Sequence, residues 1–189
     1  MIHDSMVIGF DLDGVIIDHS KNKIKKAKEL GYVIKAEETS SERLYKLIPQ
    51  EDYQVIRKFI YRRGTPMAEP MEGAFQTIKS LSKNYHIVII SRRDEDLQRN
   101  ALEWLKKHGF LNYIKRKDVY FVGDEKYKDV AAKRLKVRVY MDDKLSVLEL
   151  LKSVPNKILF DPYNCFQIKN KKIGKIESWQ SLLPALSLF

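Results

Sequence analysis

Short apolar runs rich in β-branched and aromatic residues alternate with helix-length stretches in this chain, and this alternation constrains the fold more than any other feature. Five runs are typical of buried strands, at residues 6–10, 86–90, 119–122, 137–141 and 157–160. The stretches between the later runs carry apolar residues three and four positions apart, as amphipathic helices do. Because parallel strands need such helical crossovers, the pattern predicts an α/β fold with a five-stranded parallel sheet covered by helices.

The gap between the first two predicted strands is too long for a plain crossover. It spans about 75 residues, where a crossover with its helix needs only a few dozen. Helical patterns occupy residues 20–30, 39–48 and 50–63, and the prolines Pro66 and Pro70 then indicate a return to the core before a helix at 72–83. We therefore expect a core formed by residues 1–17 and 70–189, with a helical subdomain inserted at 18–69.

The composition narrows the class of protein and of partner. The 189 residues include 35 Lys and Arg against 25 Asp and Glu, a formal net charge of +10, which favours an anionic partner such as a phosphorylated small molecule or nucleic acid. No apolar run approaches the roughly 20 residues that a membrane span needs, and the single cysteine, Cys165, excludes an internal disulfide. We expect a cytoplasmic protein that does not enter a membrane.

Acidic residues follow two of the predicted strands, at the ends that face the ligand crevice of an open parallel sheet. Asp11 and Asp13, with Gly14 directly after them, follow the first strand, and Asp142 and Asp143 follow the fourth. If these strands are neighbours, the carboxylates converge and repel one another unless a cation lies between them, and an oxygen-only ligand set favours Mg2+. The simpler interpretation is a turn at the first strand and a helix cap at the fourth.

A third strand end carries residues suited to an anion. Ser91 and Arg92 follow the second predicted strand just before a helix, where a hydroxyl and free backbone N–H groups suit a phosphate oxygen. Ser91 on its own would be interpreted as a helix cap. Its place among three polar strand ends favours a phosphate site.

Together these motifs resemble those of the haloacid dehalogenase superfamily of phosphotransferases, and the likeness spans nearly the whole chain: Asp11-Leu12-Asp13-Gly14-Val15, Ser91, a lysine, and Asp142-Asp143. The resemblance implies a Rossmann-like three-layer core. The segment 18–69 is similar to the superfamily's type 1 cap, which closes over the site and shapes the choice of substrate. Within the superfamily, the ending Ile158-Leu-Phe-Asp161-Pro-Tyr-Asn164, followed by Ser178-Trp179, is similar to small 5′(3′)-deoxyribonucleotidases.

The resemblance also implies a role for each motif. Asp11 would attack phosphorus and form an aspartyl-phosphate, and Asp13 would protonate the leaving alcohol and then deprotonate the attacking water. Mg2+ would be held by Asp11, the Asp13 backbone carbonyl and Asp142, with Asp143 as a further candidate ligand. Ser91 and the Arg92 amide would hold the phosphoryl oxygens, and a lysine would neutralise the phosphate.

Two positions compete for that lysine, and two alignments compete for the last acidic motif. Lys128 fits the superfamily pattern best, since it precedes Asp142 by 14 residues, and Lys126 is the alternative. The rival alignment uses Gly123-Asp124 with Asp129, but it leaves Asp142 and Asp143 without a role. Asp124 is therefore expected to cap the helix that follows it.

Other residues of the inserted segment carry weaker signals. His19 is expected at the surface, with substrate contact as the alternative. Arg62 and Arg63 are candidate contacts to phosphate or substrate. Four aromatic residues recur at helical spacing, which favours packing within the subdomain over a base-stacking platform: Tyr45, Tyr53, Phe59 and Tyr61.

These inferences predict a Mg2+-dependent phosphomonoester hydrolase that works through an aspartyl-phosphate, with a 5′-nucleotidase acting on nucleoside monophosphates as the favoured activity. Asp13 argues against a dehalogenase, which needs no second acid at that place. A sugar phosphomutase or sugar-phosphate phosphatase would use the same site. The alternative to an enzyme is a noncatalytic protein that binds nucleic acid or a phosphorylated ligand. The converging acidic residues argue against this alternative.

Overall fold

The computed structural model describes residues 5–187 and is built around one parallel sheet. Six strands lie in the order β5-β4-β1-β6-β7-β8, and every neighbouring pair is parallel. The strands are β1 (Val7–Phe10), β4 (His86–Arg92), β5 (Val119–Val122), β6 (Val137–Asp142), β7 (Asn156–Phe160) and β8 (Ile173–Ile176). The predicted α/β class and parallel sheet are therefore confirmed.

The predicted number of strands is wrong by one. β8 lies at the edge of the sheet, where it pairs only with β7, and it was missed because its four residues include just two large apolar side chains, Ile173 and Ile176. The stretch around it is rich in lysine, so neither an apolar run nor a clear alternation marks it in the sequence. An edge strand needs less apolar surface than a central strand, which is buried on both faces.

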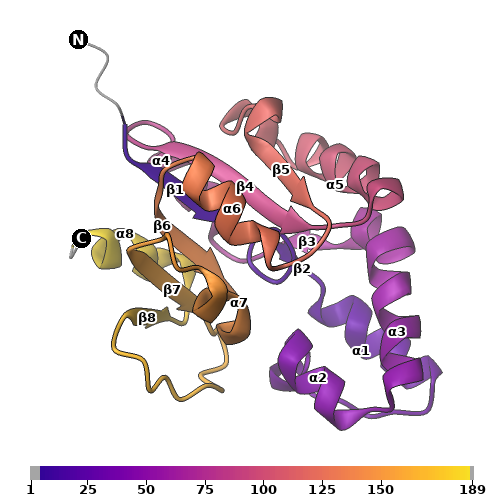
Figure 1. The fold of residues 1–189 in the computed structure, drawn as a ribbon. Coiled ribbons are helices and arrows are strands. Elements are labelled where there is room, and N and C mark those ends of the chain that lie inside the picture. Colours follow the sequence, from indigo (N-terminus) through magenta and orange to yellow (C-terminus); the bar gives the residue numbers. More distant parts are fainter. Residues whose placement is uncertain (1–4, 188–189) are drawn as a thin grey trace.

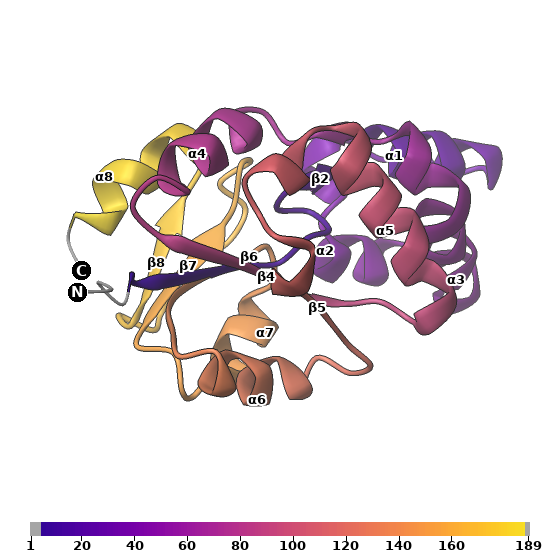
Figure 2. The ribbon, with the colours of Figure 1, turned by 90° about the horizontal axis from the view of Figure 1, so that it is seen from above.

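Helices cover both faces of the sheet (Figure 2). On one face α4 (Ala74–Leu81), α5 (Glu95–Lys107) and α8 (Leu182–Leu186) pack against alternate strand residues such as Ile87 and Ile89. On the other face α6 (Tyr127–Arg134) and α7 (Leu145–Leu150) pack against Val88 and Ile90. Consecutive residues of β4 thus point into two separate apolar layers, which explains why the central strands are continuous apolar runs in the sequence.

Three helices form a separate group beside the sheet (Figure 1). They are α1 (Ser20–Glu29), α2 (Ser41–Leu47) and α3 (Gln50–Phe59), and their apolar side chains make a cluster of their own around Leu44 and Ile56. A short antiparallel pair, β2 (Ile17–Asp18) and β3 (Glu69–Pro70), joins the two ends of this helical insert to the core.

The helix predicted over residues 50–63 is interrupted. α3 ends at Phe59, and a wider π-helical turn, which includes Tyr61, follows over Ile60–Gly64. None of the helices within residues 5–187 combines the length and apolarity that crossing a membrane requires.

Candidate active site

The loop after β1 places two aspartates at the carboxyl edge of the sheet. The Asp11 amide continues the ladder by donating to the Met141 carbonyl of β6 at 2.9 Å, and the Gly14 amide closes a tight loop by donating to the Ile17 carbonyl at 2.9 Å. Gly14 has a φ of +87°, and a Cβ atom there would overlap the Asp143 carboxylate. This position therefore requires glycine, for its backbone conformation and for the space it leaves.

β1 and β6 are neighbours, so the acidic residues at their ends converge. Carboxylate oxygens of Asp11, Asp142 and Asp143 lie within 4.8 Å of one another, and all three residues are buried. The Lys128 ammonium of α6 lies 2.9 Å from Asp11 Oδ1 and 2.8 Å from Asp142 Oδ2. One lysine thus bridges two of the three carboxylates.

The electrostatics of this cluster show an excess of negative charge. Burial, reinforced by the neighbouring Asp142 and Asp143, raises the pKa of Asp11 to about 7 in spite of Lys128. Burial and the nearby Asp142 raise the pKa of Asp143 to about 6. Burial alone would lower the pKa of Lys128, but Asp11 and Asp142 hold it well above its usual value, so this lysine stays charged.

The cluster fits a hard divalent cation. Its donors are all carboxylate oxygens, with neither His nor Cys among them, and Asp143 Oδ1 is buried without a hydrogen-bond partner. Three carboxylates with one ammonium between them leave two negative charges that a dication would balance. Oxygen donors of this kind suit Mg2+ better than zinc or copper.

Asp13 is held by a different set of partners. Its carboxylate accepts hydrogen bonds from Arg93, at 2.9 Å from Nε to Oδ2 and through a second, shorter contact from the terminal nitrogen, and His19 Nε2 lies 2.7 Å from Oδ1. Burial by itself would raise the pKa of Asp13, but Arg93 and His19 together lower it well below its usual range. Burial lowers the pKa of His19, so its neutral ring donates to an ionised Asp13.

Arg93 is a site residue that the sequence did not single out, and His19 is one for which a surface position was favoured over substrate contact. The Arg93 side chain is fully buried, lies 5.2 Å over the Tyr61 ring, and donates to Thr65 Oγ1 at 3.3 Å. It therefore ties the Asp13 loop to the end of the helical insert. His19 is buried, which contradicts its expected surface position. The one signal in the sequence was that Arg93 directly follows the motif Ser91-Arg92.

One cavity connects these groups with the helical insert. This catalytic cavity has a volume of about 160 Å³. The core contributes Asp11, Asp13, Ser91, Arg92, Glu125, Lys128 and Lys144, and the insert contributes Ser41, Tyr53, Gln54, Arg57 and Tyr61. The three strand ends predicted to converge therefore do so, and Ser91 and Arg92 line the same cavity as residues of the insert.

The remaining predicted residues fall outside this cavity. Lys126 is exposed and lies 3.7 Å from Asp124, whose other carboxylate oxygen accepts the Lys126 amide just before α6. Asp129 bonds to Ser153 instead of reaching the site. Arg62 pairs with Asp96 at 2.8 Å on the surface, and Arg63 is exposed.

Two of the four aromatic residues of the insert pack against its apolar cluster and also line the catalytic cavity. These are Tyr53 and Tyr61, so the expected packing is confirmed for them. Phe59 packs against the apolar cluster of the insert, and Tyr45 meets the edge of Tyr53 with ring centroids 5.4 Å apart.

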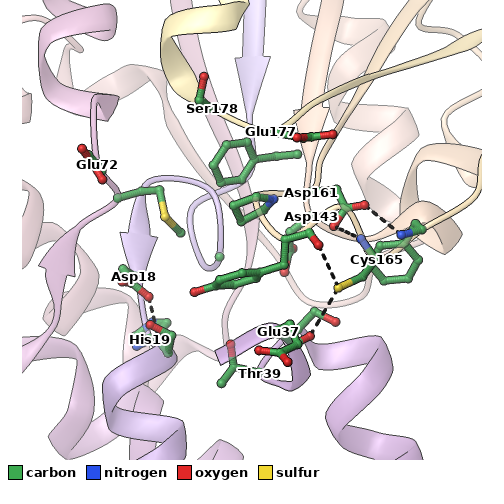
Figure 3. Close-up of a pocket in the computed structure, with 18 of the residues that line it drawn as sticks. Asp18, His19, Glu37, Thr39, Glu72, Asp143, Asp161, Cys165, Glu177 and Ser178 are labelled. Atoms are coloured by element: carbon green, nitrogen blue, oxygen red, sulfur yellow. Dashed lines mark hydrogen bonds between the residues drawn. The ribbon is translucent and has the colours of Figure 1, made fainter. Parts of the chain in front are cut away.

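A second and larger cavity lies between the insert and the strand ends of β7 and β8 (Figure 3). This acidic cleft has a volume of about 420 Å³. Six carboxylates line it, from Asp18, Glu37, Glu72, Asp143, Asp161 and Glu177, and Lys23 is the one lysine or arginine among its lining residues. Aromatic side chains such as Tyr163 and Phe166 complete its walls.

Comparison with known protein families identifies one whose model matches this chain. The family described as 5′ nucleotidase, deoxy (pyrimidine), cytosolic type C protein matches residues 5–186. None of the curated protein sequences matches this chain significantly.

Solved structures share the fold at low sequence identity. A haloacid dehalogenase-like hydrolase from Streptococcus pneumoniae is 15% identical, with a TM-score of 0.67 over 96% of this chain and 98% of that one. YfnB from Bacillus subtilis, in a magnesium-bound form, is 13% identical with a TM-score of 0.67 over 96% and 98%. A hydrolase from Deinococcus radiodurans with bound phosphate is 15% identical with a TM-score of 0.64 over 96% and 95%.

Proposed function

The chain belongs to the family of cytosolic type C 5′-nucleotidases, and from this premise we propose that it hydrolyses nucleoside monophosphates with Mg2+ and an aspartyl-phosphate formed on Asp11. The family lies within the haloacid dehalogenase superfamily, so the protein is a hydrolase of the phosphatase class. The observation that carries the proposal is the buried Asp11 carboxylate. It opens into the catalytic cavity beside Ser91, with the Lys128 ammonium 2.9 Å away.

In this proposal Asp11, Asp142, Asp143 and the Asp13 backbone carbonyl would hold Mg2+, and the bound ion would supply the positive charge that shields nucleophile and phosphate from each other. Asp11 attacks phosphorus while the bond to the leaving oxygen breaks. The Lys128 ammonium, which two carboxylates keep charged, offsets the charge that the phosphoryl oxygens carry during transfer. Ser91 and the Arg92 amide hold those oxygens at the end of β4.

Asp13 moves the protons. Because Arg93 and His19 hold it as a carboxylate, it is ready to take the proton of the water that hydrolyses the aspartyl-phosphate. To protonate the leaving oxygen in the first step, it must first acquire a proton. The arrival of a phosphate dianion beside Asp13 favours this, because a nearby negative charge raises the pKa of a carboxyl group.

The helical insert supplies the wall opposite the nucleophile. We propose that residues 18–69 act as a cap that excludes water during the reaction, on a core of residues 1–17 and 70–189. Tyr53, Gln54 and Arg57 of α3 would then contact the leaving group, because they line the cavity across from the strand ends. We also place the enzyme in the cytoplasm, in keeping with its family and with a single unpaired cysteine.

The test is phosphate release from a panel of nucleoside monophosphates, sugar phosphates and an aryl phosphate, each with Mg2+ and with a chelator. We expect release that requires Mg2+, with a nucleoside monophosphate as the best substrate, and at least a thousandfold loss in Asp11→Asn. Asp124→Asn, which removes an exposed carboxylate outside the cavity, is the matched control and should retain activity.

Acid quenching during turnover should trap phosphate on the protein, and Asp11→Asn should abolish it. Transfer of phosphate between positions of a sugar without net release would instead indicate a mutase. Absence of both reactions in folded, Mg2+-loaded protein would refute the proposed activity.

A further inference from the structure

The two cavities at the junction of insert and core differ in charge. The acidic cleft is lined by the carboxylates labelled in Figure 3, which number six, and by a single lysine, Lys23. The residues that line the catalytic cavity include three carboxylates, from Asp11, Asp13 and Glu125, against four cations, from Arg57, Arg92, Lys128 and Lys144, while Asp142 and Asp143 lie beside Asp11 without lining it. A second negative group on a substrate is therefore repelled from the acidic cleft and attracted toward the catalytic cavity.

Each carboxylate of the catalytic cavity already has a cationic partner. Lys128 lies 2.9 Å from Asp11, Lys144 lies 2.6 Å from Glu125, and the guanidinium of Arg93, behind the cavity wall, holds Asp13. Within residues 5–187, no carboxylate lies at ion-pair distance from Arg57 or Arg92. The positive charges of Arg57 and Arg92 therefore remain available to a ligand, in addition to Lys128, which serves the transferred phosphoryl group.

Arg57 is placed to meet the leaving group. Its guanidinium lies 5.7 Å over the Tyr61 ring, and its one side-chain hydrogen bond, to Gln54 Oε1, is long at 3.5 Å. The side chain is half-buried in the insert wall, whereas Asp11 lies at the strand ends of the core. In an in-line displacement the leaving oxygen departs on the side opposite the nucleophile. Arg57 therefore faces the part of the substrate that leaves.

From this geometry we infer that Arg57 binds a second anionic group, a carboxylate or a phosphate, on the leaving group, so that a phosphomonoester with such a group binds more tightly than its counterpart without one. The inference rests on the proposed function and adds a binding subsite to the same cavity, so that among nucleotides a nucleoside bisphosphate is favoured over the matching monophosphate. The small volume of the catalytic cavity, below the roughly 300 to 1,000 Å³ usual for drug-sized ligands, keeps this second group close to the transferred phosphoryl group.

The test measures ligand binding by calorimetry on Asp11→Asn with Mg2+ present, so that bound esters are not turned over. Two matched pairs separate the two sources of the second charge: 3-phosphoglycerate against glycerol 3-phosphate, and deoxyadenosine 3′,5′-bisphosphate against the 5′-monophosphate. We expect the doubly anionic member of at least one pair to bind about ten- to a hundredfold more tightly, the effect of a charge-assisted hydrogen bond.

Adding Arg57→Gln should reduce that preference to about twofold or less. Lys58→Gln is the matched control, because it removes the same charge one residue away, on an exposed side chain that does not line the cavity, and the preference should persist. Equal affinities within both pairs would overturn the inference. So would an equal loss of affinity for all four ligands in Arg57→Gln, since Arg57 would then contact the transferred phosphoryl group itself.

This measurement is independent of turnover. If wild-type protein hydrolyses none of the four esters but the binding preference depends on Arg57, the second-anion site stands and the proposed hydrolase activity fails. If hydrolysis occurs and no preference exists, the activity stands and the site fails.

Discussion

At the scale of single residues, the pairing of Asp13 with Arg93 is the contact on which this site most depends. Both side chains are nearly or fully buried, and removing one partner of a buried ion pair leaves the other charge without compensation. We expect Arg93→Met to lower the free energy of unfolding by about 3–5 kcal/mol in urea denaturation.

The double variant Arg93→Met with Asp13→Asn should recover part of that loss, because it removes the unpaired charge as well. The control is Arg99→Met on α5, whose partner Glu103 is exposed, and it should cost about 0.5 kcal/mol or less. Equal costs for Arg93→Met and Arg99→Met would contradict the importance of the buried pair.

The acidic cluster makes the metal-free protein sensitive to pH. The pKa values of Asp11 and Asp143 are raised from about 3.8 to about 7 and about 6, so between about pH 4 and pH 7 the folded protein holds protons that the unfolded chain has released. The stability that this contributes is complete at low pH and is lost as the pH rises through that window. Mg2+ should offset the loss, since it binds the ionised carboxylates.

We therefore expect Asp11→Asn to raise the melting temperature of the metal-free protein at about pH 8 by roughly 2–4 °C, and to reduce the further rise that Mg2+ produces. Differential scanning calorimetry with a chelator and with Mg2+ checks both effects. Asp124→Asn should change neither. If the metal-free protein became more stable as the pH rises from 5 to about 8, the carboxylates of the cluster would not be repelling one another.

Much of the core side of the site could be predicted from residue types at strand ends. Asp11, Ser91 and Asp142 each follow an apolar run, and the geometry of a parallel sheet brings such ends together. Arg93 and His19 could not be placed in this way. Their contacts with Asp13 depend on how a loop 80 residues away and the start of the insert fold, and no periodicity in the sequence records that.

At the scale of elements, the loop after β1 is supported by a turn from the far end of the chain. The Trp179 indole, in the short helical turn Trp179–Ser181, is fully buried, packs 5.1 Å from the Phe10 ring, and donates from Nε1 to the Val15 carbonyl at 2.9 Å. This hydrogen bond holds the segment that directly follows Asp13 and Gly14.

Trp179→Phe should therefore lower both stability and turnover. The lost hydrogen bond leaves a buried carbonyl without a partner, at a cost of about 1–3 kcal/mol, and the loosened loop should reduce kcat about tenfold or more. Trp104→Phe is the matched control, because it loses an equivalent bond to the Ala68 carbonyl at 2.8 Å, away from the Asp13 loop. Urea denaturation and phosphate release measure the two effects, and equal losses of kcat in both variants would contradict a specific role for Trp179.

The elements that the sequence predicted best are those buried most completely. β1, β4 and β6 lie inside the sheet, and their continuous apolar runs follow from burial on both faces. β8 was not predicted because it lies at the edge of the described sheet, where one side of the strand has no partner. The end of α3 was placed too far along the chain because the π-helical turn continues the apolar pattern of the helix with a different number of residues per turn.

At the scale of the whole molecule, one unusually long gap between two strands is what predicts a helical insert in the sheet. What the sequence could not provide is how the insert sits over the sheet. That placement brings Arg57 and Tyr61 to the catalytic cavity and leaves a separate, acid-lined cleft on the other side of Asp143. Both depend on contacts between segments that are distant along the chain, which local patterns do not encode.

The bond from Trp179 to Val15 also has a consequence for biosynthesis. The loop after β1 is translated well before the side chain that braces it, because Val15 and Trp179 are 164 residues apart. β1 likewise waits for β4 and β6, its partners on either side. A nascent chain therefore cannot brace this loop until Trp179 has been translated, and shorter nascent chains carry the acidic motif without that support.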